Sequence, residues 1–259
     1  MIVASFNING VRARLPRLLE WLQDRKPDVA LLQELKCQDQ AFPAEQFEDL
    51  GYNIATNGQK SFNGVAILSK YPLEDLNPVL DGDSGDTQAR WLEAVVGGTR
   101  PVRVCCLYLP NGNPVPSPKY DYKLAWMERL HSKMSDLLAL EEPAVVAGDY
   151  NVIPQPEDAA KPERWKNDAL YLPETRAAWR RLLNMGYTDA FRAVHPTARS
   201  FTFWDYQRRA WQRDDGIRID HMLLTPQCAD MLKDCQIDRN VRAQEKPSDH
   251  VPIWVELNT

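Results

Sequence analysis

The sequence contains no stretch of about 18 uncharged apolar residues, the length that a helix needs to cross a membrane. It also lacks the basic segment, apolar segment and small-residue cleavage site of a signal peptide at its start. Its five cysteines include no CxxC pair and cannot all pair with one another. We therefore expect a cytoplasmic protein that binds no membrane and keeps reduced, mostly buried thiols.

The sequence also has fewer basic than acidic residues. It contains 31 Lys and Arg and 36 Asp and Glu, which gives a net charge of -5. Proteins that only bind nucleic acid neutralise phosphates with a basic surface, so this balance disfavours such a role. It does not exclude an enzyme that meets phosphates at an acidic centre filled by a metal ion. Intrinsic disorder is excluded as the main state, since 44% of the residues are hydrophobic.

Short apolar segments alternate with helical patterns along the whole chain, without a linker or a repeat. Helices are predicted around Leu15–Leu22 and over Tyr122–Leu140, each with an apolar stripe, and over Thr175–Met185. The predicted strands are Ile2–Phe6, Val29–Leu32, Val65–Leu68, Leu92–Val96, Val102–Leu109, Ala144–Ala147, Ile219–Leu224 and Val251–Leu257. This pattern predicts an α/β or α+β fold with one core in a single domain, 1–259. Spacing alone does not separate a parallel from a mixed sheet.

Polar residues repeatedly stand where apolar strands end. Asn7 and Asn9 follow the first strand, Glu34 the second, and Asp149 and Asn151 the run Val145–Ala147. Residues i and i+2 of an extended segment point to the same side, so Asp149 and Asn151 can face one site. Asp220, Asp249 and His250 stand in and before the last strands. The carboxyl ends of strands form the rim where ligands bind in many α/β folds.

Each of these residues alone also fits a structural role, such as a turn, a helix cap or a packed histidine. Together they form a set of carboxylate and amide oxygens without thiolates, which suits Mg²⁺ or Mn²⁺. Zinc is disfavoured, because the four histidines show no ligand spacing.

Six segments in this order resemble the exonuclease III family of bacterial DNA-repair nucleases, within the endonuclease/exonuclease/phosphatase superfamily. They are Phe6–Gly10, Leu32–Lys36, Gly64–Leu68, Gly148–Asn151, Arg218–His221 and Lys246–His250, which span nearly the full chain. Any one of these motifs is weak, whereas the ordered set is very specific.

The resemblance implies a four-layered α/β sandwich, in which two packed mixed β-sheets are flanked by helices. It also implies Mg²⁺-dependent hydrolysis of double-stranded DNA, with Mn²⁺ able to substitute. The implied reactions are 3′→5′ exonuclease action that releases 5′-mononucleotides, trimming of 3′ ends, and cleavage 5′ to abasic sites in base excision repair. An exonuclease-dominant member with weak abasic-site incision is the alternative within the family. We expect a monomer.

The resemblance also implies roles for individual residues. Asp149 activates the attacking water and Asn151 orients it. Tyr108 and His250 contact the scissile phosphate, and Asp220 pairs with His250. The implied metal ligands are Asn7, Glu34, Asp149, Asn151, Asp249 and His250, and the implied DNA-contacting residues are Arg90, Asn111, Leu170 and Trp204.

Three positions depart from the family pattern. Asn111 replaces a glutamine of some relatives, and His221 an aliphatic residue, so we expect His221 on the opposite face of its strand. Leu170 falls where relatives that act on abasic sites have a small residue, although a shift of one position would put Ala169 there instead. A larger side chain at that place would narrow the pocket for an extruded abasic nucleotide. A basic rim for DNA is expected from Lys60, Arg90, Lys119, Lys123, Arg208, Arg209 and Arg213.

Two other readings remain open. A phosphatase or phosphodiesterase for lipid or inositol phosphates would keep Glu34, Asp149, Asn151 and His250, but not the surface formed by Arg90 and Phe203–Tyr206. A non-catalytic DNA-binding protein on the same fold would be free to lose at least one metal or phosphate residue, and none is missing.

Overall fold

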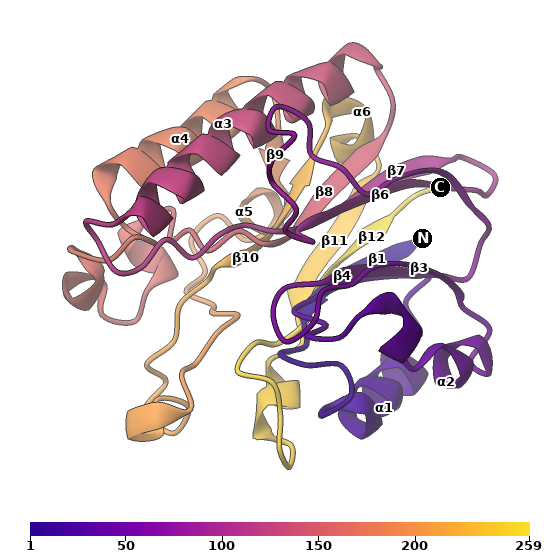
Figure 1. Cartoon of the computed structure of the whole chain (residues 1–259), viewed down its shortest axis with the longest axis horizontal. Helices are drawn as coiled ribbons and strands as arrows, with labels where there is room; N and C mark the ends of the chain where they lie inside the picture. Colours follow the sequence, from indigo (N-terminus) through magenta and orange to yellow (C-terminus); the bar gives the residue numbers. More distant parts are fainter.

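A computed structural model describes all residues of the chain, 1–259. It contains two six-stranded sheets packed face to face, with helices on both outer faces (Figure 1). The four-layered α/β sandwich with two mixed sheets, which the resemblance to the exonuclease III family implied, is therefore confirmed. No helix of the structure is both long and apolar enough to traverse a membrane.

The first sheet has the strand order β11-β12-β1-β2-β4-β3. Its strands are β11 (Leu232–Ile237), β12 (Ile253–Leu257), β1 (Ile2–Asn7), β2 (Val29–Gln33), β4 (Val65–Ser69) and β3 (Asn53–Asn57). β1 and β2 are parallel and the other pairs are antiparallel.

The second sheet has the order β5-β6-β7-β8-β10-β9. Its strands are β5 (Leu73–Asn77), β6 (Trp91–Val96), β7 (Val102–Tyr108), β8 (Ala144–Asp149), β10 (Asp220–Leu224) and β9 (Thr188–Asp189). Here β7 and β8 form the parallel pair. The carboxyl ends of β1, β2, β7 and β8 meet at one edge of the sandwich, because β1 and β2 pack on β7 and β8.

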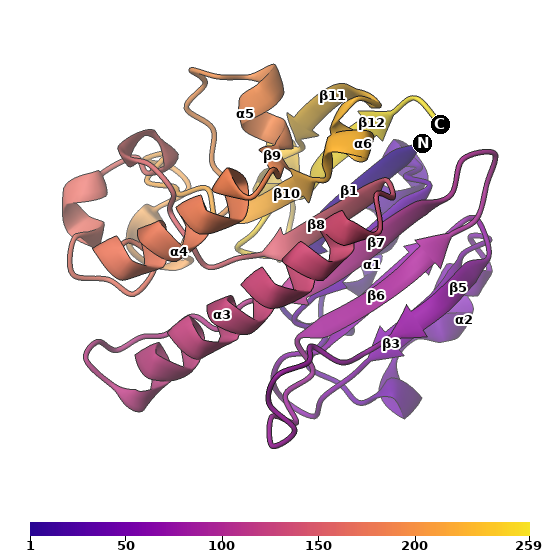
Figure 2. The same cartoon turned by 90° about the horizontal axis from the view of Figure 1, so that it is seen from above.

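The helices cover the outer faces of the two sheets. The first sheet carries α1 (Leu15–Arg25) and α2 (Ala44–Glu48), and the second carries α3 (Pro118–Ala139) and α4 (Pro173–Asn184) (Figures 1 and 2). Two short helices, α5 (Ala190–Val194) and α6 (Pro226–Ala229), flank β10. Proline in the first turn of α1, α3 and α4 suits a position whose N–H has no helical partner.

Side-chain alternation along the strands builds three apolar layers. Val3 faces the layer between the sheets, whereas Phe6 packs under α1. Cys105 and Cys106 divide in the same way, with Cys106 between the sheets and Cys105 under α3. The prediction that these neighbours point to opposite faces is confirmed, and all five cysteines are free and buried.

The predicted strands match β1, β2, β4, β6, β7, β8, β10 and β12 within a few residues. The four strands that the sequence did not reveal are β3, β5, β9 and β11, and each lies at the edge of a sheet. Edge strands are only half buried, so they lack the continuous apolar run of central strands. In β5, for example, buried and exposed residues do not alternate, and three of the five residues are exposed.

Candidate active site

The polar residues at the strand ends converge at one edge of the sandwich. Asn7 ends β1, Glu34 follows β2, and Asp149 ends β8. Asp220 begins β10 directly opposite Asp149 in the antiparallel register. The loop before β12 brings His250 to the same place, where its backbone pairs with that of Phe203.

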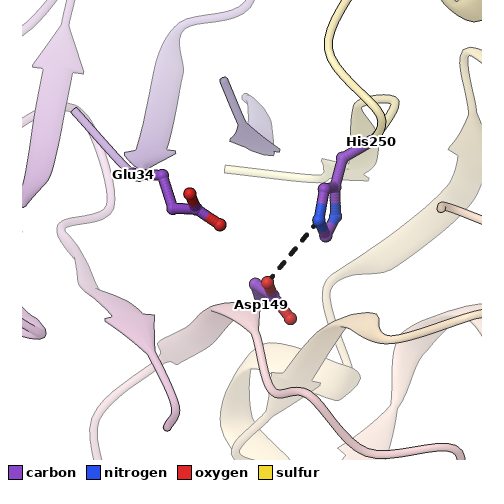
Figure 3. A group of neighbouring side chains, drawn as sticks. All are labelled: Glu34, Asp149 and His250. Atoms are coloured by element: carbon purple, nitrogen blue, oxygen red, sulfur yellow. Dashed lines mark ion pairs between the residues drawn. The ribbon is translucent and has the colours of Figure 1, made fainter. Parts of the chain in front are cut away.

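Three of these side chains point toward one another from three different segments (Figure 3). The ligand atoms of Glu34, Asp149 and His250 all lie within 4.8 Å of one another. Two ligands of one ion, each at about 2.0–2.6 Å from it, are separated by this order of distance. The cluster therefore has the spacing and the oxygen-rich donor set that suit a divalent cation.

Asn7 bridges the two carboxylates of this cluster. Its Nδ2 donates to Glu34 Oε1 and to Asp149 Oδ2, both at 3.0 Å. Its amide oxygen accepts from the backbone N–H of Asn9 at 3.0 Å. Asn7 thus lies in the predicted site, but it presents its nitrogen rather than its oxygen to the carboxylates.

Two further groups contact Glu34. The hydroxyl of Tyr108 donates to Glu34 Oε1 at 2.9 Å, and the Lys36 ammonium lies 2.9 Å from Oε2. Burial by itself would raise the pKa of Glu34, but the hydrogen bonds from Lys36 and Asn7 outweigh it and the pKa is lowered. Glu34 is therefore an anion at neutral pH and already attracts one cation.

His250 lies between two buried carboxylates. Its Nδ1 is 2.8 Å from Asp220 Oδ2, and its Nε2 is 3.7 Å from Asp149 Oδ2. Burial alone would lower the pKa of His250, but the negative charges of Asp220 and Asp149 raise it. Burial raises the pKa of Asp149 itself, although its Oδ1 accepts from the backbone N–H of Asn151 at 2.9 Å. A charged imidazole facing an accessible pocket can donate to an anion.

A pocket of about 190 Å³ opens above this cluster. Its lining includes the polar residues Asn111, Asn151 and Asp249 and the apolar residues Trp165, Leu170, Phe203 and Ile219. Asn111 Nδ2 donates to Asn151 Oδ1 at 3.0 Å, and Asp249 Oδ1 accepts from Asn9 Nδ2 at 2.9 Å. The structure thus brings together the predicted residues Asn7, Glu34, Tyr108, Asn111, Asp149, Asn151, Leu170, Asp220, Asp249 and His250.

Ala169 and Leu170, neighbours in one loop, lie differently with respect to the pocket. Leu170 lines the pocket, whereas Ala169 is fully buried and its N–H donates to Asn113 Oδ1 at 3.1 Å. Arg90 lies outside the pocket, where its guanidinium stacks on the Tyr108 ring at 4.8 Å. His221 is buried away from the site, as expected from the sequence, and contacts Arg218 and the Val152 carbonyl.

The expectation that Trp204 contacts DNA is wrong. Its side chain is fully buried between Phe201 and Trp211, and its Nε1 donates to Asp214. Neighbours in an extended segment face opposite sides, so Phe203 points to the site and Trp204 to the core. Phe203 packs edge-on against the His250 ring at 5.0 Å between ring centres. The sequence showed the aromatic pair without showing which of the two faces outward.

The expectation that Lys123 belongs to a basic rim is also wrong, because Lys123 is fully buried. Burial lowers the pKa of its ammonium to about 7, and the negative charge of Asp149 opposes this shift. Lys60, Lys119, Arg208, Arg209 and Arg213 are exposed, and Arg90 is half-buried. Arg208 and Arg213 line a second hollow, of about 360 Å³, that shares Trp165, Phe203 and Asp205 with the main pocket.

The arrangement of a two-sheet sandwich with a carboxylate–histidine cluster at its strand ends is that of a phosphoester-hydrolysing enzyme. Residues 4–250 match the Endonuclease/Exonuclease/phosphatase family, and the chain belongs to this family. It is 35% identical to exodeoxyribonuclease III from Haemophilus influenzae over 98% of both chains.

Solved structures of relatives agree with this assignment. An AP endonuclease from Archaeoglobus fulgidus has a TM-score of 0.95 and 36% identity, with both chains fully covered. The 3′ phosphatase NExo from Neisseria, bound to a product DNA hairpin, has a TM-score of 0.96 and 36% identity over the full length of both chains. The chain is a hydrolytic nuclease of this family, and the resemblance to exonuclease III seen in the sequence is confirmed.

Proposed function

We propose that this nuclease is a Mg²⁺-dependent DNA-repair phosphodiesterase that acts on double-stranded DNA. Its reactions are 3′→5′ removal of mononucleotides, trimming of 3′ ends and incision 5′ to abasic sites. Mn²⁺ replaces Mg²⁺, and the whole chain, 1–259, works as one catalytic domain, as a monomer in the cytoplasm. The relatives named exodeoxyribonuclease III, AP endonuclease and 3′ phosphatase support this range of substrates.

The observation that carries the proposal is the mixed lining of the pocket. It contains the charged cluster Glu34, Asp149 and His250 and also the apolar side chains Trp165, Phe203 and Ile219. A phosphodiester of DNA has the matching character, because an anionic phosphate is joined to a largely apolar deoxyribose ring.

In the proposed reaction, the Asp149 carboxylate accepts a proton from the attacking water. The water oxygen forms a bond to phosphorus, and the bond from phosphorus to the leaving ester oxygen breaks. Asn7 and the backbone N–H of Asn151 hold the carboxylate in place through hydrogen bonds of 3.0 and 2.9 Å. A positioned base of this kind contributes about 10²–10⁴ to the rate.

His250 binds the phosphate as a cation. Asp220 accepts from its Nδ1, which leaves Nε2–H free to donate to a non-bridging phosphate oxygen. The raised pKa of His250 keeps this proton in place at neutral pH. A protonated imidazole cannot also ligate a metal, so we assign His250 to the phosphate rather than to the ion.

The carboxylates of Glu34 and Asp149 would hold the divalent ion, with Asp249 at the rim of the same pocket. When bound, such an ion neutralises the phosphate and stabilises charge on the leaving oxygen. The Lys36 ammonium and Asn7 keep the Glu34 carboxylate ionised, as a ligand for a divalent ion must be. Carboxylate and amide oxygens without thiolates fit Mg²⁺ and Mn²⁺.

Leu170 favours a variant of this function in which resection from 3′ ends dominates over incision at abasic sites. Its side chain occupies the pocket wall at the place where we expect relatives that act on abasic sites to have a small residue. The Neisseria relative, with 36% identity, is named a 3′ phosphatase, which is a 3′-end activity.

The proposal is tested with a labelled DNA duplex that contains one internal abasic site. In Mg²⁺ we expect incision 5′ to the abasic site and shortening from the 3′ ends, and EDTA should stop both reactions. Added Mg²⁺ or Mn²⁺ should restore them. Activity that persists in EDTA, or binding without any cleavage, would contradict the proposal.

A second substrate separates the proposal from the phosphatase alternative. A phosphatase for lipid or inositol phosphates would release phosphate from a small phosphomonoester at least as fast as from a 3′-phosphorylated duplex. We expect the opposite order, because the exposed basic residues near the pocket give a duplex additional phosphate contacts.

A further inference from the structure

The side chain of Lys123 runs from α3 into the protein and ends at the backbone of Asn111 and Asn151, two polar residues that line the active-site pocket. Its Nζ lies 3.2 Å from the Pro110 carbonyl oxygen, 3.1 Å from that of Asn111 and 2.6 Å from that of Asn151. The residue is fully buried, and its ammonium contacts backbone carbonyls of the active-site loops. Burying an amine away from water is costly unless hydrogen bonds compensate, and these three carbonyl oxygens supply them.

The three acceptors belong to two different loops. Pro110 and Asn111 follow β7, and Asn151 follows β8. The one amine nitrogen of Lys123 lies within hydrogen-bond distance of carbonyl oxygens from both loops. One side chain therefore fixes the separation of the loop after β7 and the loop after β8.

These loops need such a restraint. Asn151 has a φ of 48°, in the left-handed region that non-glycine residues rarely adopt. Gly112 has a φ of 90°, and a Cβ there would lie only 2.7 Å from the Lys123 Cδ. The backbone can therefore close over the lysine only because residue 112 has no side chain.

The restrained loops carry the groups that the proposed reaction uses. Asn111 Nδ2 donates to Asn151 Oδ1, and the Asn151 N–H donates to Asp149 Oδ1. A shift of Asn151 would thus move both the pocket amide and the partner of the catalytic carboxylate. Displacements of about 1 Å in such positions can lower rates by 10²-fold.

We propose that Lys123 is a positioning residue, which sets the geometry of Asn111, Asn151 and Asp149 through three backbone carbonyls. It does not touch DNA, because it is buried under the loops. This inference rests on the proposed function, since it concerns the same site and the same reaction. Lys123 should therefore affect the rate of the chemical step and not the affinity for substrate.

The test compares Lys123→Met with a matched control on the same helix. Lys133, ten residues further along α3, pairs with Glu93 at 2.6 Å, is 15% exposed and lies outside the pocket lining. We expect Lys123→Met to lower kcat on the 3′-recessed duplex at least tenfold while KM changes less than threefold. Lys133→Met should leave both constants within twofold of the wild type, even where it lowers the thermal midpoint.

A double variant tests the route of the effect. If Lys123 acts through Asn111 and Asn151, Lys123→Met combined with Asn111→Ala should lose less activity than the product of the two single losses. Lys123→Gln, which keeps a donor without the charge, serves if Lys123→Met does not fold, and we expect an intermediate kcat.

Several results would overturn the inference. They are an unchanged kcat in folded Lys123→Met, a rise in KM alone, an equal loss of kcat in Lys133→Met, or a failure of both Lys123 variants to fold. The wild-type enzyme tests the proposed function separately from this inference. If the wild type does not cleave duplex DNA in Mg²⁺, the proposed function fails, whatever the variants do.

Discussion

Leu170 provides a direct test of how the pocket selects its substrates. Its side chain is 3% exposed and lines the pocket beside Trp165 and Phe203. The backbone is held independently, because the N–H of Leu170 donates to Asp168 Oδ1 at 2.9 Å and its carbonyl accepts from Ile153 at 2.8 Å. Leu170→Ala should therefore widen the pocket without releasing the loop.

The size of the effect follows from the crowding of the pocket. An extruded abasic sugar must share this pocket with the phosphate that is cleaved, and Leu170 is part of the pocket lining. Fitting an extra group into a filled site costs about 1–3 kcal/mol. If Leu170→Ala removes about 1 kcal/mol of this steric cost, the rate of abasic incision should rise roughly fivefold relative to that of 3′→5′ resection. A frayed 3′ end enters by a less obstructed path, so its rate should change less.

Both rates should be measured as a ratio on one enzyme preparation, since truncation of a buried leucine lowers stability by about 2–5 kcal/mol. Leu170→Met, which nearly conserves volume, is the control and should keep the wild-type ratio within twofold. Equal losses of both activities in Leu170→Ala, with a constant ratio, would refute the steric argument and leave Leu170 with a packing role only.

The remaining predictions concern the metal site and a buried histidine. Glu34→Ala should raise the Mg²⁺ concentration for half-maximal activity at least tenfold, with partial rescue by Mn²⁺, and a metal titration with no change would remove Glu34 from the site. His221 has a pKa lowered to about 4 by burial and by Arg218, so it is neutral when folded. Because the unfolded chain binds this proton first, the free energy of unfolding should fall by up to about 1.4 kcal/mol per unit as pH drops from 6.5 toward 4. His221→Gln should flatten this dependence in urea titrations, and an identical pH profile in both proteins would contradict it.

The central strands could be predicted because burial on both faces leaves a continuous apolar run, as in Val29–Gln33. The edge strands could not, because one side of each meets solvent or a loop. The charged residues at the strand ends were predictable as a group, since carboxylates and amides are rare next to buried strands without a reason. Their convergence depends on two sheets packing with aligned ends, which no local pattern encodes.

The pocket wall was the least predictable part of the site. Trp165, Phe203 and Ile219 look like ordinary core residues in the sequence, and Trp204 looks more suited to stacking than Phe203. Which of the two side chains faces outward depends on how the backbone pairs. The backbone of Phe203 pairs with that of Ile217 and of His250. Lys123 shows the reverse error, since a lysine near a loop is usually exposed, and only the three-dimensional path of two loops buries it.

The most direct test of the account is the single-turnover rate of Asp149→Asn on the abasic duplex in saturating Mg²⁺, beside its DNA affinity. Asparagine can still accept from the Asn151 N–H, so the loop and the fold should persist, but it cannot take the proton of water. We expect the rate to fall by about 10²–10⁴ while the Kd for DNA changes less than threefold. A rate near that of the wild type would contradict the assignment of Asp149 as the base, and with it the proposed mechanism.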